Sequence, residues 1–268
     1  MEINKIYCAD NVSFMKENIP DKFIDLTVTS PPYDNLRAYN GYSWDFEGVA
    51  KELYRITKDG GVVVWVVCDA TIKGSETGTS FKQALYFKEI GFNLHDTMIY
   101  QSDKPPLTHN RYEQKFEYMF VFSKGKPKIF NPIMEKCKCV GKMVKSTYRH
   151  TGKDTQEAHK QAKVKSHKIK GNIWFYHTGH NQSTTDKVAY EHPAIFPEQL
   201  AADHIISWSN EGDIVFDPFC GSGTTCKMAV LNNRNYLGVE ISQEYCDIAN
   251  ERITQVDWRK TNEILLQL

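Results

Sequence analysis

Residues 215–225 read VFDPFCGSGTT, and this stretch decides the fold class that the sequence predicts. The strand pattern of residues 213–216 leads into a turn that contains Gly221 and Gly223, and a helical pattern follows. Glycine lets a backbone turn sharply and come close to a ligand. Because ligands of open α/β sheets bind at the carboxyl ends of strands, the stretch predicts a ligand-binding turn at such a place.

The glycine spacing argues against two common nucleotide-binding motifs. A dinucleotide-binding fingerprint needs a third glycine in G-x-G-x-x-G, and a P-loop needs G-x-x-x-x-G-K-[ST]; this stretch has neither. The next strand pattern, residues 236–240, ends at Glu240. Taken alone, this glutamate could cap a helix or lie on the surface. At the end of the second strand, however, an acid is positioned to accept hydrogen bonds from two ribose hydroxyls, which predicts a nucleoside cofactor.

The other strand and helix patterns predict an α/β fold with a mostly parallel sheet and helices on both faces. Residues 62–67, VVVWVV, are apolar without alternation, as in a strand that helices cover on both sides. We expect the helix before this strand to end at a cap formed by Asp59, Gly60 and Gly61. The other predicted strands are residues 5–8, 24–29, 213–216 and 236–240, with 94–100 and 117–122 as an antiparallel pair at the sheet edge, and the predicted helices are residues 11–18, 49–57, 80–90, 197–208, 224–232 and 243–253.

The composition is that of an ordinary globular chain. Of its 268 residues, 41% are hydrophobic and 25% charged, and 33 basic residues balance 33 acidic ones, so the chain has no global signature of polyanion binding. Seven cysteines, an odd number, with no signal-peptide pattern predict reduced thiols and a cytoplasmic protein. The apolar run at residues 62–67 is far too short to span a bilayer, so we expect no membrane association.

A basic insertion interrupts this pattern. Residues 135–170 contain ten lysines, one arginine and three histidines against three acidic residues, with few aliphatic residues and no clear periodicity. We therefore expect one domain made of residues 1–129 and 171–268, and an inserted region of residues 130–170. Cys137 and Cys139 precede scattered histidines, but C-x-C in this arrangement does not match the usual zinc spacing, so no metal is predicted.

Residues 29–33 read TSPPY and directly follow the predicted strand at residues 24–29. Pro31 and Pro32 fix two successive φ angles and remove two N–H donors, which leaves a rigid turn with free carbonyl acceptors. Ser30 adds a side-chain acceptor, and the ring of the tyrosine could stack on a base withdrawn from a duplex. Acceptors that hold the N–H groups of an exocyclic amine direct its lone pair at a methyl donor. By themselves, the two prolines favour the plainer interpretation of a strand that ends ahead of an ordinary loop.

The two motifs together resemble those of the amino-methyltransferases that act on DNA. VFDPFCGSGTT is similar to the cofactor motif of this family and TSPPY to its catalytic (D/N/S)-P-P-(Y/F) motif, and their order here resembles the beta group. Residues 8–18, 53–61, 117–124 and 192–200 are also similar to segments of that group. The resemblance implies a Rossmann-like methyltransferase fold with S-adenosyl-L-methionine as cofactor. It also implies direct methyl transfer, without a covalent enzyme intermediate or a metal.

Carried onto this sequence, the resemblance implies three sets of site residues. The catalytic residues are Ser30, Pro31, Pro32 and Tyr33. The cofactor residues are Asp10 at the adenine, Phe196 at the methionine pocket, Glu240, and, in the two motifs, Ser30, Asp217, Pro218, Phe219, Gly221, Ser222, Gly223 and Thr224. The insertion stands where this group has its target-recognition region, so we expect DNA contacts from Lys142, Lys145, Arg149, Lys163 and Lys165, and also from Arg37 in the loop of residues 34–42. We also expect the loop of residues 34–42 to close over the flipped base.

The resemblance predicts site-specific methylation of double-stranded DNA. Serine at position 30 is more typical of N4-cytosine methylation, and aspartate or asparagine of N6-adenine methylation, so we favour cytosine and keep adenine as the alternative. An RNA or protein amide substrate and an inactive nucleic-acid-binding protein are more distant alternatives. The intact Asp217, Gly221, Gly223 and Glu240 argue against loss of activity. The resemblance is also compatible with a homodimer and with a cognate restriction endonuclease.

Overall fold

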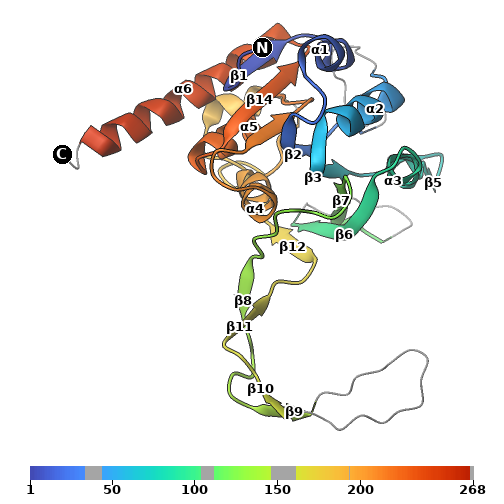
Figure 1. Cartoon of the computed structure of the whole chain (residues 1–268), viewed down its shortest axis with the longest axis vertical. Helices are drawn as coiled ribbons and strands as arrows, with labels where there is room; N and C mark the ends of the chain where they lie inside the picture. The colour runs from blue at the N-terminus through green and yellow to red at the C-terminus, as the bar shows by residue number, and fades with distance from the viewer. Residues whose placement is uncertain (34–43, 104–111, 146–160, 193, 266–268) are drawn as a thin grey trace. The chain divides into compact units, whose positions relative to one another are not determined.

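The computed structural model describes residues 1–33, 44–103, 112–145, 161–192 and 194–265. The chain forms two units, one made of Met1–Asn131 and Asn172–Leu268 and the other of Pro132–Gly171. The larger unit contains an eight-stranded sheet in the order β1, β14, β13, β2, β3, β7, β6 and β12 (Figure 1). These strands are β1 (Lys5–Cys8), β14 (Asn235–Glu240), β13 (Ile214–Asp217), β2 (Ile24–Thr29), β3 (Thr57–Val67), β7 (Phe116–Ser123), β6 (Asn93–Ser102) and β12 (Ile173–Tyr176).

The sheet is mostly parallel, as predicted. Its neighbouring strands run parallel except in the two pairs that β7 makes, with β3 and with β6. The predicted antiparallel pair is therefore present as β6 and β7. Its predicted place at the sheet edge was wrong, because Ile173–Tyr176 returns after the insertion and pairs in parallel with the outer side of β6.

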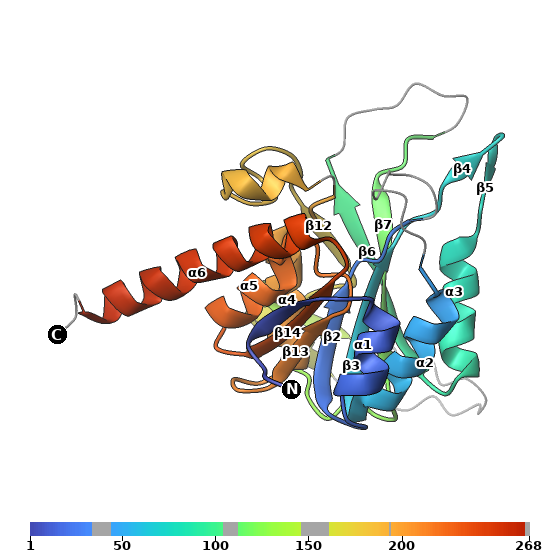
Figure 2. The same ribbon diagram turned by 90° about the horizontal axis from the view of Figure 1, so that it is seen from above.

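Helices cover both faces of the sheet, which confirms the predicted fold class. In Figure 2, α1, α2 and α3 lie on one side of the sheet, and α4, α5 and α6 lie on the other. On the first side, Trp65, Phe87 and Phe122 form the centre of a buried aromatic core. The helices are α1 (Asn11–Asn18), α2 (Phe46–Ile56), α3 (Thr79–Glu89), α4 (Glu198–Trp208), α5 (Thr224–Leu231) and α6 (Gln243–Leu265).

Helix α2 does not end at a glycine cap as predicted. It ends at Ile56, and the backbone of Thr57 is already extended, with φ −69° and ψ 131°. Gly60 lies inside strand β3 with φ +82°, and its N–H donates to the carbonyl of Lys124. A Cβ at Gly60 would lie 2.4 Å from Cγ of Lys128. The glycine therefore allows a close approach between distant segments, a tertiary requirement that the local pattern does not show.

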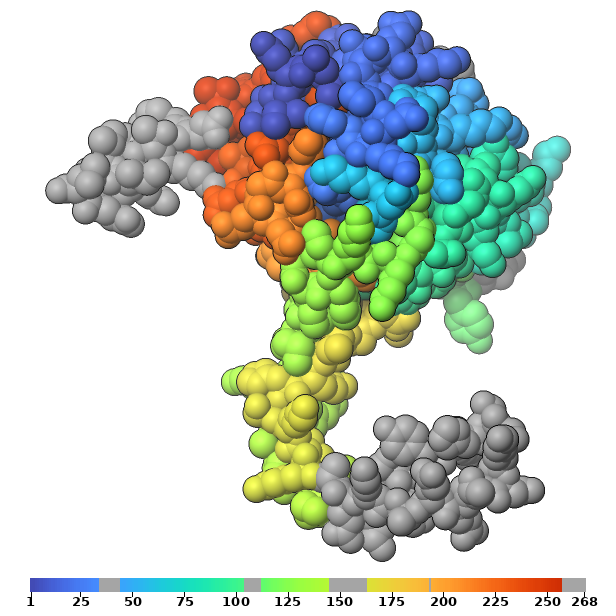
Figure 3. All heavy atoms as spheres, viewed as in Figure 1, coloured from blue at the N-terminus to red at the C-terminus, as the bar shows by residue number. Residues whose placement is uncertain are grey.

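The strand order brings four segments of the chain to one edge of the sheet. Because β1, β14, β13 and β2 are parallel neighbours, their carboxyl ends lie together. Asp10 follows β1, Glu240 ends β14, the glycine turn follows β13 and Ser30 follows β2. Figure 3 shows segments from the two ends of the larger unit's sequence side by side on its surface, as the pairing of β1 with β14 requires.

The smaller unit consists of two short antiparallel pairs in the described residues. β8 (Met134–Lys136) pairs with β11 (His167–Ile169), and β9 (Met143–Lys145) pairs with β10 (Gln161–Lys163). The larger unit also has a small hairpin, β4 (Thr71–Ile72) and β5 (Ser75–Glu76), and a 3-10 helix, η1 (Lys187–Glu191). Within the described ranges, no helix has the length and apolar character that a membrane span requires.

Candidate active site

A cavity of about 680 Å³ lies at the carboxyl ends of the four parallel strands. Its volume falls within the range of small-molecule sites. Residues of both sequence motifs line it together: Ser30, Pro32 and Tyr33 from TSPPY, and Pro218, Phe219, Gly221, Ser222 and Thr224 from the glycine stretch. Asp10, Phe196 and Glu240 line the same cavity. The structure thus brings together most of the residues that sequence reasoning assigned to the catalytic and cofactor sites.

The glycine turn connects β13 to α5 and supplies one wall of the cavity. Gly221 has φ +47° and Gly223 has φ +78°, a left-handed region that other residues rarely adopt. The N–H of Gly223 donates to the carbonyl of Cys220 at 2.7 Å, which closes the turn ahead of Thr224. A Cβ at Gly223 would lie 2.7 Å from Cβ of Ala249 on helix α6. Glycine at this position therefore allows the close packing of the turn against that helix.

Glu240 forms the acidic end of the cavity. Its Oε2 accepts from the N–H of Gly221 at 2.9 Å, and its Oε1 accepts from the N–H of Ser242 at 3.0 Å. Burial raises the pKa of this carboxyl, and the backbone hydrogen bonds oppose that effect. Each carboxylate oxygen can accept more than one hydrogen bond, so both remain able to accept from ligand hydroxyls. This geometry fits the predicted recognition of a ribose.

Asp10 is an exposed residue at the start of helix α1. Its Oδ1 accepts from the N–H of Ser13 at 2.9 Å, so it caps the helix. The neighbouring Asn11 donates from Nδ2 to the carbonyl of Pro218 at 3.0 Å. That bond joins the segment after β1 to the glycine turn. Sequence reasoning did not single out this asparagine, which also lines the cavity.

Three of the predicted catalytic and cofactor residues, Pro31, Asp217 and Gly223, do not line the cavity. Asp217 is buried, and its Oδ1 accepts from Oγ1 of Thr29 at 2.6 Å and from the N–H of Phe219 at 3.0 Å. Burial raises the pKa of Asp217 to about 6. The carboxyl of Asp217 therefore links the end of β2 to the glycine turn through hydrogen bonds, and it does not line the space that a cofactor would fill.

A chain of hydrogen bonds orients the TSPPY turn. The hydroxyl of Tyr33 donates to Oε2 of Glu117 at 2.9 Å, and it lies 2.7 Å from Oγ of Ser30. A phenol has a single hydrogen, so the contact with Ser30 is donated by the serine. Burial, and next the charge of Glu117, raise the pKa of Tyr33 well above its ordinary value, which keeps this phenol protonated. The lone pairs of Ser30 Oγ are left to accept from a group in the cavity.

Sequence reasoning missed Glu117 and several aromatic residues of the cavity wall. Glu117 is 7% exposed and begins the EYMFVFSK stretch, which was matched as a segment without a role for its first residue. Its position on β7, within hydrogen-bonding distance of Tyr33 in the TSPPY turn, depends on sheet order and could not be predicted from spacing. The missed aromatic residues of the wall are Trp44, Tyr100, Tyr190 and Tyr245.

The predicted DNA contacts are only partly within the described structure. Lys142, Lys163 and Lys165 are exposed in the smaller unit. Arg37 and Arg149 lie outside the described residues, as do the loop of residues 34–42 and the side chain of Lys145. Among the described residues, no group of three or more histidine, cysteine, aspartate or glutamate side chains could hold a metal ion.

Comparison with known proteins identifies the family to which this fold and this site belong. A family model described as DNA methylase, for the N6/N4 methyltransferases, matches residues 24–251, so the chain belongs to this family. It is 65% identical over 243 residues to the orphan methyltransferase M.BamHII of Bacillus amyloliquefaciens, covering 89% of this chain and 92% of that relative.

Solved structures share the fold. The cytosine-N4-specific PvuII DNA methyltransferase superposes with a TM-score of 0.68 at 20% identity, covering 96% of this chain and 92% of the other. The M1.HpyAVI complex with SAM has a TM-score of 0.56 at 23% identity, covering 92% of this chain and 98% of the other. The chain is therefore a DNA methyltransferase of the N6/N4 family, with the fold of both structures.

Proposed function

We propose that the chain methylates the N4 amino group of cytosine in double-stranded DNA, with S-adenosyl-L-methionine as the methyl donor. The observation that carries this proposal is the single cavity lined by both Ser30 and Glu240. A methyl donor held at Glu240 and an amine held at Ser30 would share this space. The bound cofactor supplies an electrophilic methyl group on a sulfonium.

The residues of the cavity fit that cofactor. Glu240 and Asp10 offer carboxylate oxygens to the hydroxyls and amine of a nucleoside, and Gly221 leaves room for a ligand to come close to the backbone of the turn. The rings of Phe219 and Trp44, whose centroids lie 5.0 Å apart in an edge contact, give the cavity an apolar surface. The SAM complex of M1.HpyAVI, which has the same fold, supports this choice of cofactor.

The catalytic turn would act on the amine by orientation. Because Ser30 donates its own hydrogen to Tyr33, its oxygen is a pure acceptor toward the cavity, and an amino N–H is a pure donor. Accepting that N–H would turn the nitrogen lone pair toward the methyl group, which is catalysis by placed dipoles and alignment. The half-buried position of Tyr33 and its bond to Glu117 fix the serine in this arrangement.

Ser30 also supports cytosine as the target, because serine at this position resembles the N4-cytosine enzymes of the family. The PvuII enzyme, which has the same fold, is cytosine-N4-specific. The family model covers both N6 and N4 enzymes, so N6-adenine is the second candidate.

We further propose that the smaller unit recognises the target sequence. Its exposed Lys142, Lys163 and Lys165 carry the charge that phosphate contacts require. The name of M.BamHII as an orphan methyltransferase supports action without a cognate endonuclease.

The test is product analysis. Purified protein is incubated with unmethylated DNA of varied sequence and S-adenosyl-L-methionine, and the DNA is digested to nucleosides for mass spectrometry. We expect N4-methylcytosine with the wild type and none with Ser30→Ala at equal DNA affinity. N6-methyladenine would overturn the choice of base and keep the rest. No methylated nucleoside from any DNA would refute the proposed function.

A further inference from the structure

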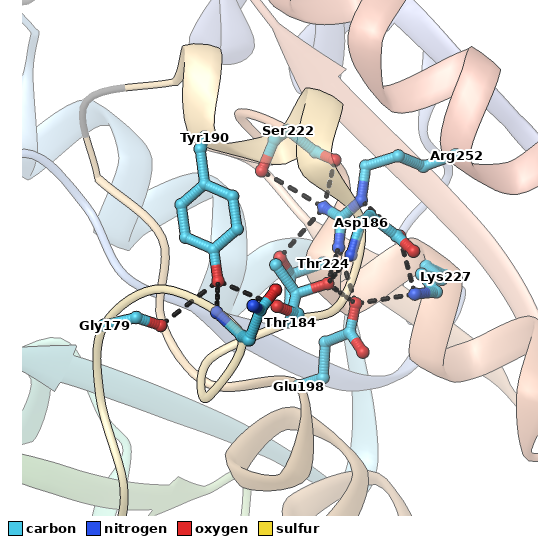
Figure 4. A network of polar contacts seen from close by, with 10 residues as sticks. Gly179, Thr184, Asp186, Tyr190, Glu198, Ser222, Thr224, Lys227 and Arg252 are labelled. Atoms are coloured by element: carbon cyan, nitrogen blue, oxygen red, sulfur yellow. Dashed lines mark hydrogen bonds and ion pairs between the residues drawn. The ribbon is translucent and has the colours of Figure 1, made fainter.

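A buried cluster of four charges lies behind the cofactor cavity. Arg252 on helix α6 and Lys227 on α5 face the carboxylates of Asp186 and Glu198 (Figure 4). The arginine is 0% exposed, and the lysine side chain is 6% exposed. Two positive and two negative charges balance, which a buried set of ions requires. No step of the proposed reaction uses these groups.

Both cations contact the same two carboxylates. Lys227 Nζ lies 2.7 Å from Oδ2 of Asp186 and 2.6 Å from Oε1 of Glu198. Arg252 reaches the same two oxygens, through Nε at 3.0 Å and through Nη2 at 2.7 Å. Lys227 and Arg252 therefore each form an ion pair with both carboxylates.

Arg252 differs from Lys227 because it also holds the glycine turn. Its Nη1 donates to the carbonyl and to Oγ of Ser222 and lies 3.2 Å from Oγ1 of Thr224. Ser222 and Thr224 both line the cavity. The planar guanidinium therefore bonds to the turn with one nitrogen and to the carboxylates with the other two, a geometry that an ammonium cannot reproduce.

The carboxylates lead to the opposite wall of the cavity. Asp186 lies in the segment of residues 178–192, which lines the cavity through Thr178, Gly179, Ser183 and Tyr190, among others. Within that segment, the hydroxyl of Tyr190 lies 2.7 Å from the carbonyl of Thr184 and 3.1 Å from that of Gly179 (Figure 4). A displacement of Asp186 would therefore be passed to the cavity wall.

We propose that Arg252 is a positioning residue of the cofactor site, which fixes the glycine turn at a set distance from the wall formed by residues 178–192. This inference rests on the proposed cofactor site. The guanidinium bonds to both walls, to the carbonyl of Ser222 in the glycine turn and to the carboxylate of Asp186 in residues 178–192. The spacing that the cofactor requires is thus set by a side chain that never contacts it.

The matched pair of variants is Arg252→Met and Lys227→Met. Each removes one positive charge from the same two carboxylates, but only the first releases Ser222. Binding of S-adenosyl-L-homocysteine is measured by titration calorimetry at a temperature where circular dichroism shows each variant fully folded. We expect Arg252→Met to raise the Kd at least tenfold and Lys227→Met to raise it less than threefold, with similar falls in Tm.

A purely structural role for Arg252 would lower the Tm without changing the Kd of the folded protein, and that result would overturn the proposal. Equal increases in Kd for both variants would also overturn it, because they would assign the effect to the carboxylates. If Arg252→Met does not fold, Arg252→Lys decides. It keeps the charge and should raise the KM for the cofactor at least tenfold, while kcat and the KM for DNA stay within threefold. An unchanged cofactor KM would refute the proposal. Failure of the wild type to bind the cofactor would instead refute the proposed site.

Discussion

Replacing Gly223 by alanine should destabilise the protein more than any comparable change in the same turn. An L-residue in the left-handed region costs about 1–2 kcal/mol. The added Cβ would lie 2.7 Å from Cβ and 3.1 Å from Cα of Ala249, whereas carbon atoms in contact lie about 3.5–4.0 Å apart. Because Ala249 lies in helix α6, the backbone must shift, and such overpacking costs about 1–3 kcal/mol. The unfolding free energy should fall by about 2–5 kcal/mol in total.

Two other glycines provide the controls. Gly125 has φ +75°, nearly the angle of Gly223, and a Cβ there meets nothing within 4 Å. Gly125→Ala should therefore lose only the backbone term of about 1–2 kcal/mol. A Cβ at Gly221 would lie 2.8 Å from Nε2 of His192, a side chain whose Nδ1 lies 2.7 Å from the carbonyl oxygen of Ala194. Because only this side chain and no backbone must shift, Gly221→Ala should lose more stability than Gly125→Ala and less than Gly223→Ala, and it should weaken cofactor binding because His192 lines the cavity.

Urea unfolding followed by circular dichroism measures the three unfolding free energies, and titration with S-adenosyl-L-homocysteine measures binding. Equal losses of stability for Gly223→Ala and Gly125→Ala would refute the claim that helix α6 packs tightly on the turn. Unchanged binding in Gly221→Ala would show that His192 does not shape the cofactor cavity.

Two further predictions concern buried hydroxyl and carboxyl groups. Tyr33→Phe keeps the ring and removes the hydroxyl that links Ser30 to Glu117. The kcat should fall roughly tenfold to a hundredfold, the equivalent of about 1.5–3 kcal/mol, while the Kd for the cofactor stays unchanged. An unchanged kcat would contradict this role. Burial raises the pKa of Asp217 to about 6 in the folded protein, against about 4 in the unfolded chain. Between about pH 4 and 6 the folded protein therefore binds more protons than the unfolded chain, and it loses up to about 3 kcal/mol of stability as the pH rises through this range. Urea unfolding at several pH values should show that the unfolding free energy of Asp217→Asn rises relative to that of the wild type between about pH 4 and 6. A constant difference would exclude a raised pKa at Asp217.

The elements predicted from the sequence were those whose signals are local. Strand β2 and helix α1 have the predicted bounds, because a β-branched run ahead of two prolines and an aspartate cap mark their ends. The glycine turn and Glu240 were also local signals, a strand, a turn and an acid in order. Parallel strand order then placed them beside Ser30, as the fold class implies.

The features that sequence reasoning missed depend on distant partners. Glu117 and Arg252 each stand on a regular element and acquire their contacts only when a remote segment packs against it. Gly60 was predicted to be part of a helix cap, because the local pattern does not show its close approach to Lys128. Asp217 was predicted as a cofactor residue because it stands in the motif; the structure places its Oδ1 as the acceptor for Thr29 and for the backbone N–H of Phe219.

The pairing of β1 with β14 has a consequence for how the protein is made. Cys8 pairs with Glu240, so the strand that precedes Asp10 has no partner until more than two hundred further residues have left the ribosome. Domains generally fold as units during synthesis, and contacts between distant segments form late. A nascent chain that already contains the TSPPY turn therefore lacks a cofactor pocket. A product that ends before β14 is therefore expected to lack the wall of the cavity that Glu240 forms.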